Sequence, residues 1–159
     1  MKLPSGLTNG QLLTATREGG IVNQAYWDPM GKCWTAGIGC TGSEITEGII
    51  LTDDEATQKF IEKYSYAENG ARNDIRPIVW DTLSDVRKAA LTDIAYQQGV
   101  AGLLEYHHMI IAVQDGDWPT AKAQCIASKA DKQTPGRCEE NAEMLLTNDW
   151  PSWLELSNT

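Results

Sequence analysis

The chain has 159 residues and a formal net charge of -9, from 13 Lys and Arg residues against 22 Asp and Glu residues. Its apolar share of 42% is that of an ordinary globular protein, which excludes a disordered or collagen-like chain. A length of this order predicts one domain. The acidic balance argues against nucleic-acid binding, which normally needs a basic surface to neutralise phosphates.

The N-terminal residues carry one lysine, Lys2, followed by turn-forming residues, so they lack the long apolar segment of a signal peptide. No stretch reaches the ~20 apolar residues that a membrane span requires. We therefore expect a protein that is made in the cytoplasm and has no stable membrane association. The cysteines form no Cys-x-x-Cys pair, which argues against zinc. We expect reduced structural thiols, with disulfides as the alternative, at Cys33, Cys40, Cys125 and Cys138.

The first part of the chain predicts a short helix and then a small sheet. Thr8-Asn9-Gly10-Gln11 is typical of a capping box that starts a helix, and Gly19-Gly20 would end it. From Tyr26 to Gly42, glycines, aromatic residues and β-branched residues recur without helical period, which predicts an irregular antiparallel sheet. Within it, Asp28-Pro29-Met30-Gly31 fits a type I turn.

The rest of the chain predicts helices almost throughout, so the expected fold class is α+β. A sheet-bearing lobe would cover about residues 8–51, a linking helix 52–67 and a helical lobe 68–159. The expected helices cover Thr52 to about Ala67, a broken segment from Asp74 to Val79, Ser84 to Gln98, Leu103 to Gln114, Trp118 to Ser128, and Pro135 to about Thr147.

Glu18 is the most informative candidate for chemistry. In the last turn of a helix, the negative end of the helix dipole disfavours a charged carboxylate, which suits an acid that must keep its proton. A solvated surface glutamate is an equal alternative. Asp28 alone is interpreted as a turn residue, but paired with Glu18 it would give the two carboxyl groups that glycoside hydrolysis needs. Thr35 could orient a water molecule, or could simply reflect β-propensity.

These residues belong to a longer resemblance. Glu18-Gly19, Tyr26-Trp27-Asp28 and Thr35-Ala36-Gly37-Ile38-Gly39 resemble the Glu, Asp and Thr catalytic motif of phage-type lysozymes, glycoside hydrolase family 24. The resemblance implies a lysozyme-like fold, with a cleft between a small sheet-bearing lobe and a larger helical lobe. It continues in order through Thr52-Asp53-Asp54-Glu55-Ala56, Tyr96-Gln97-Gln98-Gly99, Gly116-Asp117-Trp118 and Thr134-Pro135-Gly136-Arg137.

The resemblance implies roles for the three motif residues. Glu18 would be the general acid that protonates the leaving glycosidic oxygen. Asp28 and Thr35 would hold the attacking water on the opposite face of the sugar, which is an inverting arrangement. The intervals from Glu18 to Asp28 and from Asp28 to Thr35 are each one residue longer than is usual in the family.

Further positions are also implied by the resemblance. Arg137 matches a buried arginine that reaches the catalytic glutamate and couples the two lobes. Gly39, Tyr96 and Gln97 match positions that bind substrate in the cleft, and for the two side chains packing beneath the cleft is an equal alternative. Where the family commonly has a histidine that is ion-paired within its lobe, this chain has Cys40, a departure expected to affect stability more than chemistry.

The function implied is that of an endolysin for host cell lysis. It would hydrolyse the β-1,4 bond between N-acetylmuramic acid and N-acetylglucosamine in peptidoglycan, without a cofactor or metal. We expect a monomer that reaches the periplasm after holin-type release. The alternative is a lysozyme-like peptidoglycan-binding or tail-structural module without catalysis.

Overall fold

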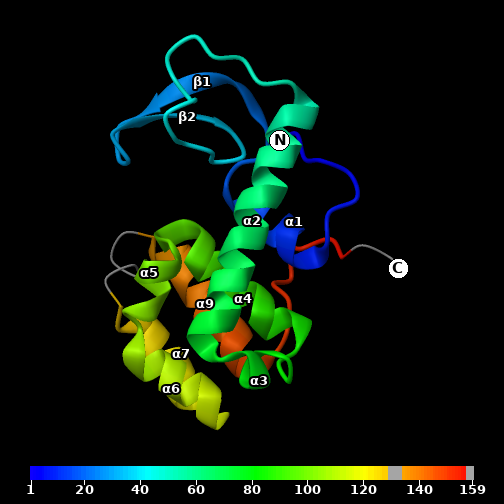
Figure 1. Cartoon of the computed structure of the whole chain (residues 1–159). Helices are drawn as coiled ribbons and strands as arrows, with labels where there is room; N and C mark the ends of the chain where they lie inside the picture. Colours follow the sequence, from blue (N-terminus) through cyan, green and yellow to red (C-terminus); the bar gives the residue numbers. More distant parts are fainter. Residues whose placement is uncertain (129–133, 157–159) are drawn as a thin grey trace. The chain divides into compact units, whose positions relative to one another are not determined.

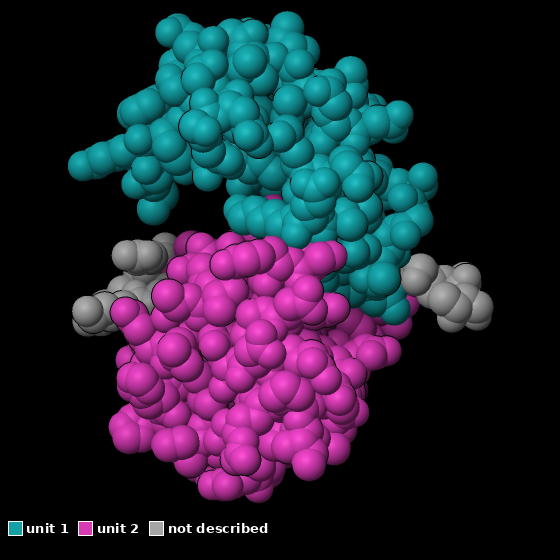
Figure 2. Space-filling model, in the orientation of Figure 1, with its two compact units in different colours: residues 1–64 teal, residues 65–159 magenta. Residues whose placement is uncertain are grey.

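The computed structural model describes residues 1–128 and 134–156, which divide into the units Met1–Tyr64 and Ser65–Thr159 (Figure 1 and Figure 2). A two-stranded antiparallel sheet accompanied by helices confirms the α+β class. The elements of the first unit are α1 (Asn9–Arg17), β1 (Val22–Asp28), β2 (Cys33–Gly37) and the first part of α2 (Asp53–Ile75). Those of the second are the rest of α2, α3 (Pro77–Trp80), α4 (Asp85–Gln98), α5 (Val100–Leu104), α6 (His107–Asp115), α7 (Trp118–Ile126) and α9 (Pro135–Thr147).

Helix α1 begins and ends at the predicted residues. The Thr8 hydroxyl accepts from the Gln11 backbone N–H at 3.2 Å, and the Gln11 side-chain oxygen accepts from the Thr8 N–H at 3.0 Å. This reciprocal pair is the predicted capping box. Gly19 and Gly20 take φ values of +90° and +73°, a conformation that ends a helix and that glycine adopts without steric cost.

The hairpin starts earlier than the sequence predicted. The sheet was expected from Tyr26, but β1 begins at Val22. The reason is that the loop after β2 pairs with the beginning of β1: the Ala25 N–H donates to the Ile49 carbonyl at 2.9 Å, and the Leu51 N–H donates to the Asn23 carbonyl at 2.8 Å. A third segment therefore supports a ribbon that would be marginal as two strands alone.

Helix α2 is longer than predicted. Its capping box is confirmed, because Thr52 and Glu55 each accept from the other's backbone N–H at 3.1 Å. The expected end near Ala67 is wrong, since the helix continues to Ile75 through Gly70. A Cβ on Gly70 would lie 2.7 Å from Cγ1 of Val100, so the glycine provides room for close packing inside the helix.

Two breaks shape the second unit. Arg76 takes φ +90° between α2 and α3, so the predicted broken segment from Asp74 to Val79 is in fact the junction of two helices. The single helix expected from Leu103 to Gln114 is wrong, because it is divided between α5 and α6. Tyr106 lies at that break with a non-helical ψ of 55°, and its phenol hydrogen-bonds to Ser128 and Gln98.

A buried charge network joins α4 to α9. The carboxylate of Asp93 is 0% exposed and accepts from Nε and Nη2 of Arg137 at 3.0 and 2.9 Å. The Asn141 amide adds a third donor to Asp93 at 2.8 Å. Because a buried carboxylate needs paired charge and hydrogen bonds, these contacts fix the position of α9 against α4.

We predict that Asp93→Ala lowers the free energy of unfolding by about 3–5 kcal/mol, because it leaves the guanidinium of Arg137 largely buried with its anion removed. Glu143→Ala is the control, since it removes an exposed ion pair with Lys122 at 2.6 Å and should cost less than about 1 kcal/mol. Urea denaturation measures both values. Equal losses would contradict the assignment of Asp93 to the core of this unit.

Asp74 gives a second prediction about stability. Burial raises the pKa of its carboxyl group, and Oδ2 is buried with no hydrogen-bond partner among the described residues. A raised carboxyl pKa means that the charge destabilises the fold above the folded-state pKa, and that this cost disappears below the unfolded-state pKa of about 4. Asp74→Asn should therefore increase the free energy of unfolding at pH 7, by no more than about 1 kcal/mol because solvent screens this half-buried group, and leave it unchanged at pH 3.

Thermal unfolding at the two pH values measures this effect. Glu68→Gln is the matched control, because Glu68 lies exposed on the same helix and its charge should make little difference at either pH. A gain for Asp74→Asn that persists at pH 3 would show that the carboxylate charge is not its cause.

Candidate active site

The carboxyl group of Glu18 lies against the backbone of Gly39. Glu18 is half-buried at the C-terminal end of α1, where its N–H donates to the Thr14 carbonyl at 2.9 Å. A Cβ on Gly39 would lie 3.0 Å from Cδ of Glu18 and closer still to Oε2. The fold thus brings together two predicted site residues that come from different elements.

A tight turn holds Gly39 in place. Ala36 and Cys40 exchange two backbone hydrogen bonds, at 3.0 and 2.9 Å, and close the turn between them. Gly37 and Gly39 take φ values of +66° and +65° inside it, which L side chains rarely adopt. The ammonium group of Lys63, on α2, donates to the Gly39 carbonyl at 3.2 Å.

Asp28 and Thr35 lie on the same face of the hairpin. Tyr26 is opposite Thr35, and Asp28 is opposite Cys33. Because opposed residues share a face and alternate residues repeat it, all four side chains belong to one face, which we call the acid face. Thr35 is 4% exposed, and its hydroxyl lies 3.9 Å from the Cys33 sulfur.

Tyr26 links the acid face to Glu18 electrostatically. Burial raises the pKa of the Tyr26 phenol, and the negative charges of Asp28 and Glu18 raise it further. Both carboxyl groups therefore act on the same phenol, one from the hairpin and one from α1. The phenol stays neutral at pH 7 and can donate a hydrogen bond.

Asp28 also has a structural task. Its Oδ1 accepts from the Met30 N–H at 3.0 Å, as expected of an aspartate that opens a turn. The left-handed residue of this turn is Lys32, at φ +51°, rather than a glycine. The turn function of Asp28 is thus confirmed, while its function in holding water stays a prediction.

The remaining predicted site residues lie in the second unit. Tyr96 is 3% exposed, which leaves little of its surface for a ligand and favours the packing alternative. Gln97 is half-buried, and its amide donates to the Thr134 hydroxyl at 3.0 Å. Arg137 binds Asp93 as described above, and its expected contact with Glu18 stays a prediction.

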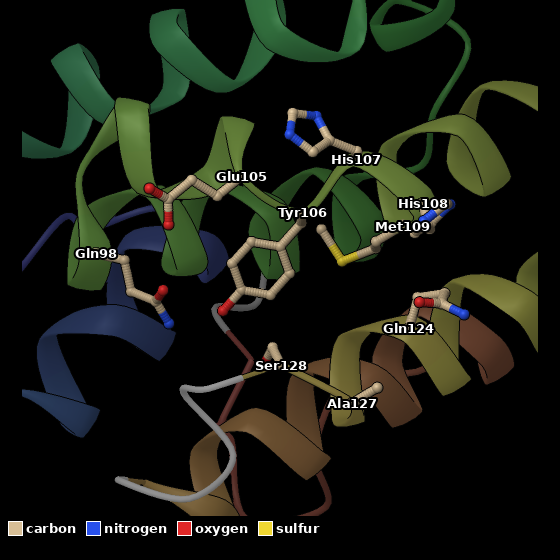
Figure 3. A pocket seen from close by; sticks show the side chains of 9 residues that line it. All are labelled: Gln98, Glu105, Tyr106, His107, His108, Met109, Gln124, Ala127 and Ser128. Carbon is tan, nitrogen blue, oxygen red and sulfur yellow. The ribbon is translucent and has the colours of Figure 1, made fainter.

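A cavity of about 280 Å³ also lies in the second unit, between α6 and α7 (Figure 3). Its lining includes Tyr106, His107 and His108, and the two histidine side chains point in different directions (Figure 3).

No group of three potential metal ligands occurs within residues 1–128 and 134–156. In the same ranges no helix is both long and apolar enough to cross a bilayer.

Lys63 is the site residue that sequence reasoning missed. It lies on α2, 24 positions after Gly39, and its bond is to a main-chain carbonyl. Every residue has a main-chain carbonyl, so the sequence does not show which carbonyl accepts the bond. No sequence pattern therefore pairs Lys63 with Gly39. The one available signal was Cys40, which stands where the family that the sequence resembles commonly has an ion-paired histidine.

Comparison with known proteins gives a family for this arrangement. The phage lysozyme family model matches residues 16–148, a stretch that includes every predicted site residue. Pre-baseplate central spike protein Gp5 of Enterobacteria phage T4 is 28% identical over 160 residues, which cover 86% of this chain and 28% of the relative. The chain therefore spans less than a third of the length of that relative. With a match of this extent to the family model, the chain belongs to the phage lysozyme family.

Proposed function

We propose that the chain is a muramidase that hydrolyses the β-1,4 bond between N-acetylmuramic acid and N-acetylglucosamine in peptidoglycan. Membership of the phage lysozyme family implies a peptidoglycan-hydrolysing glycosidase. The observation that carries the finer assignment is the position of the Glu18 carboxyl group, at the negative end of α1 and against Gly39. A general acid must be held in a fixed position, and this contact holds the Glu18 carboxyl group against the turn after β2.

In the proposed reaction, Glu18 donates its proton to the glycosidic oxygen as the bond to the anomeric carbon breaks. Asp28 and Thr35 hold a water molecule that attacks this carbon from the opposite face of the sugar, and Asp28 accepts the water's proton. The common face of these two side chains supports the pairing. The reaction needs two carboxyl groups and one water, and we propose no cofactor or metal.

The biological setting is part of the proposal. We propose an endolysin that acts as a monomer on peptidoglycan in the periplasm, after holin-type release from the host cytoplasm. The alternative is a peptidoglycan-binding or tail-structural module, and one specific observation favours it: the T4 relative is a central spike protein.

Glu18→Gln should lower the rate of turbidity loss of purified cell walls by at least about 100-fold. The reason is that the amide of glutamine cannot donate a proton to the leaving oxygen as a carboxylic acid does. Glu47→Gln is the control, since Glu47 is exposed in the same unit and should keep the wild-type rate. A Glu18→Gln protein that lyses walls at the wild-type rate would refute the assignment.

The same preparations test the non-catalytic module. Such a module would sediment with intact walls but cause no turbidity loss even as the wild-type protein. An active wild-type enzyme together with an inactive Glu18→Gln variant that still sediments with walls would support the muramidase and separate binding from catalysis.

The stereochemistry of the product is a further prediction. An inverting reaction on a β bond gives the α-anomer first, because water attacks from the face opposite the leaving group. NMR spectra of the first products, recorded before mutarotation, should show the α-anomer in excess. An initial excess of the β-anomer would instead indicate a covalent intermediate and would remove the water-holding function from Asp28.

A further inference from the structure

We propose that Lys63 is a positioning residue for the catalytic acid: its bond to the Gly39 carbonyl fixes the backbone surface against which the Glu18 carboxyl group lies. The inference rests on the proposed function of Glu18. It concerns a residue outside the three-residue motif, on a helix that contributes none of the proposed catalytic groups.

Two successive contacts within the first unit connect Lys63 to Gly39 and Gly39 to Glu18. The Lys63 ammonium donates to the Gly39 carbonyl at 3.2 Å, and Lys63 itself is half-buried. The Cα of the same glycine lies beneath the Glu18 carboxyl group, so closely that a Cβ there would lie 3.0 Å from Cδ. Gly39 thus contacts Lys63 through its carbonyl oxygen and the Glu18 carboxyl group through its Cα.

The turn depends on such an external contact because of its composition. Two of the residues between Ala36 and Cys40 are left-handed glycines, which have more accessible backbone conformations than any other residue. The two Ala36–Cys40 hydrogen bonds close the ends of the turn but leave the Gly39 carbonyl free to reorient. A charged donor on that carbonyl holds the peptide plane, and a catalytic group displaced by about 1 Å can lose 100-fold in rate.

Cys40 is the residue next to Gly39. Burial raises the pKa of its thiol, so this side chain stays neutral at pH 7 despite the nearby Lys63 charge. The position at which the sequence departs from the family pattern is therefore uncharged, and Lys63 contacts this turn through the Gly39 carbonyl.

Lys59 provides a matched control one helical turn earlier. Lys59 and Lys63 line the same cavity of about 230 Å³ beside Cys40. The Lys59 ammonium, however, binds the Glu44 carboxylate at 2.6 Å, and that carboxylate is 67% exposed. The two lysines share residue type, helix and cavity, and differ in whether their partner is the Gly39 carbonyl or a surface side chain.

The test compares kcat and KM of Lys63→Met, Lys63→Arg and Lys59→Met on soluble glycan strands from purified peptidoglycan. We expect Lys63→Met to lower kcat about tenfold with KM within twofold of wild type, because substrate binding is retained while the acid is misplaced. Lys63→Arg, which keeps a charged donor, should recover at least half of the wild-type kcat. Lys59→Met should retain the wild-type kcat.

Backbone NMR provides a readout that does not need activity. Lys63→Met should shift the amide resonances of Glu18, Gly39 and Cys40, whereas Lys59→Met should leave them in place. If Lys63→Met does not fold, Lys63→Gln, which is too short to reach the carbonyl, replaces it with the same expected result. A wild-type kcat in the folded variant, an equal loss in Lys59→Met, or unshifted resonances would each overturn the proposal.

Failure of the two proposals is distinguishable. A wild-type protein without lytic activity contradicts the muramidase, and the NMR comparison then decides whether Lys63 holds the Gly39 turn against Glu18. An active wild-type enzyme that Glu18→Gln inactivates but Lys63→Met leaves unchanged contradicts the positioning function alone.

Discussion

The contact of the Glu18 carboxyl group with the Cα of Gly39 is the constraint on which the candidate site depends. Any side chain at position 39 would occupy the space of that carboxyl group. The end of α1, the turn after β2 and the bond from Lys63 must therefore be compatible with one another at this point. Left-handed glycines on both sides of the contact, Gly20 and Gly39, show how backbone conformation places a reactive side chain.

The second unit holds a charged side chain, Asp93, inside its helical core. Asp93 accepts three hydrogen bonds from α9, two from Nε and Nη2 of Arg137 and one from the amide of Asn141. Arg137 lies in the first turn of α9, where the helix dipole disfavours a positive charge. The buried carboxylate offsets this cost, so Arg137 has a structural task whatever its relation to Glu18.

Local signals predicted most helix ends, because caps and glycines act through neighbouring residues. The capping boxes at Thr8 and Thr52 and the left-handed Gly19 and Gly20 illustrate this. The misjudged boundaries depended on distant contacts, such as Val100 packed on Gly70. The candidate site shows the same contrast between local signals and distant contacts. Its motif residues were predicted from the sequence, whereas Lys63 was not. Its partner is a carbonyl that only the folded turn presents.

The two faces of the hairpin have separate tasks. Trp27 and Trp34 are cross-strand partners whose rings meet edge to face, with centroids 5.8 Å apart and planes at 71°. Alternation places both rings on the face opposite the acid face. A cross-strand aromatic pair stabilises a ribbon by about 0.2–1 kcal/mol, and a short ribbon needs such help. The tryptophans therefore hold the register that puts Asp28 and Thr35 on one face, and do not share a surface with them.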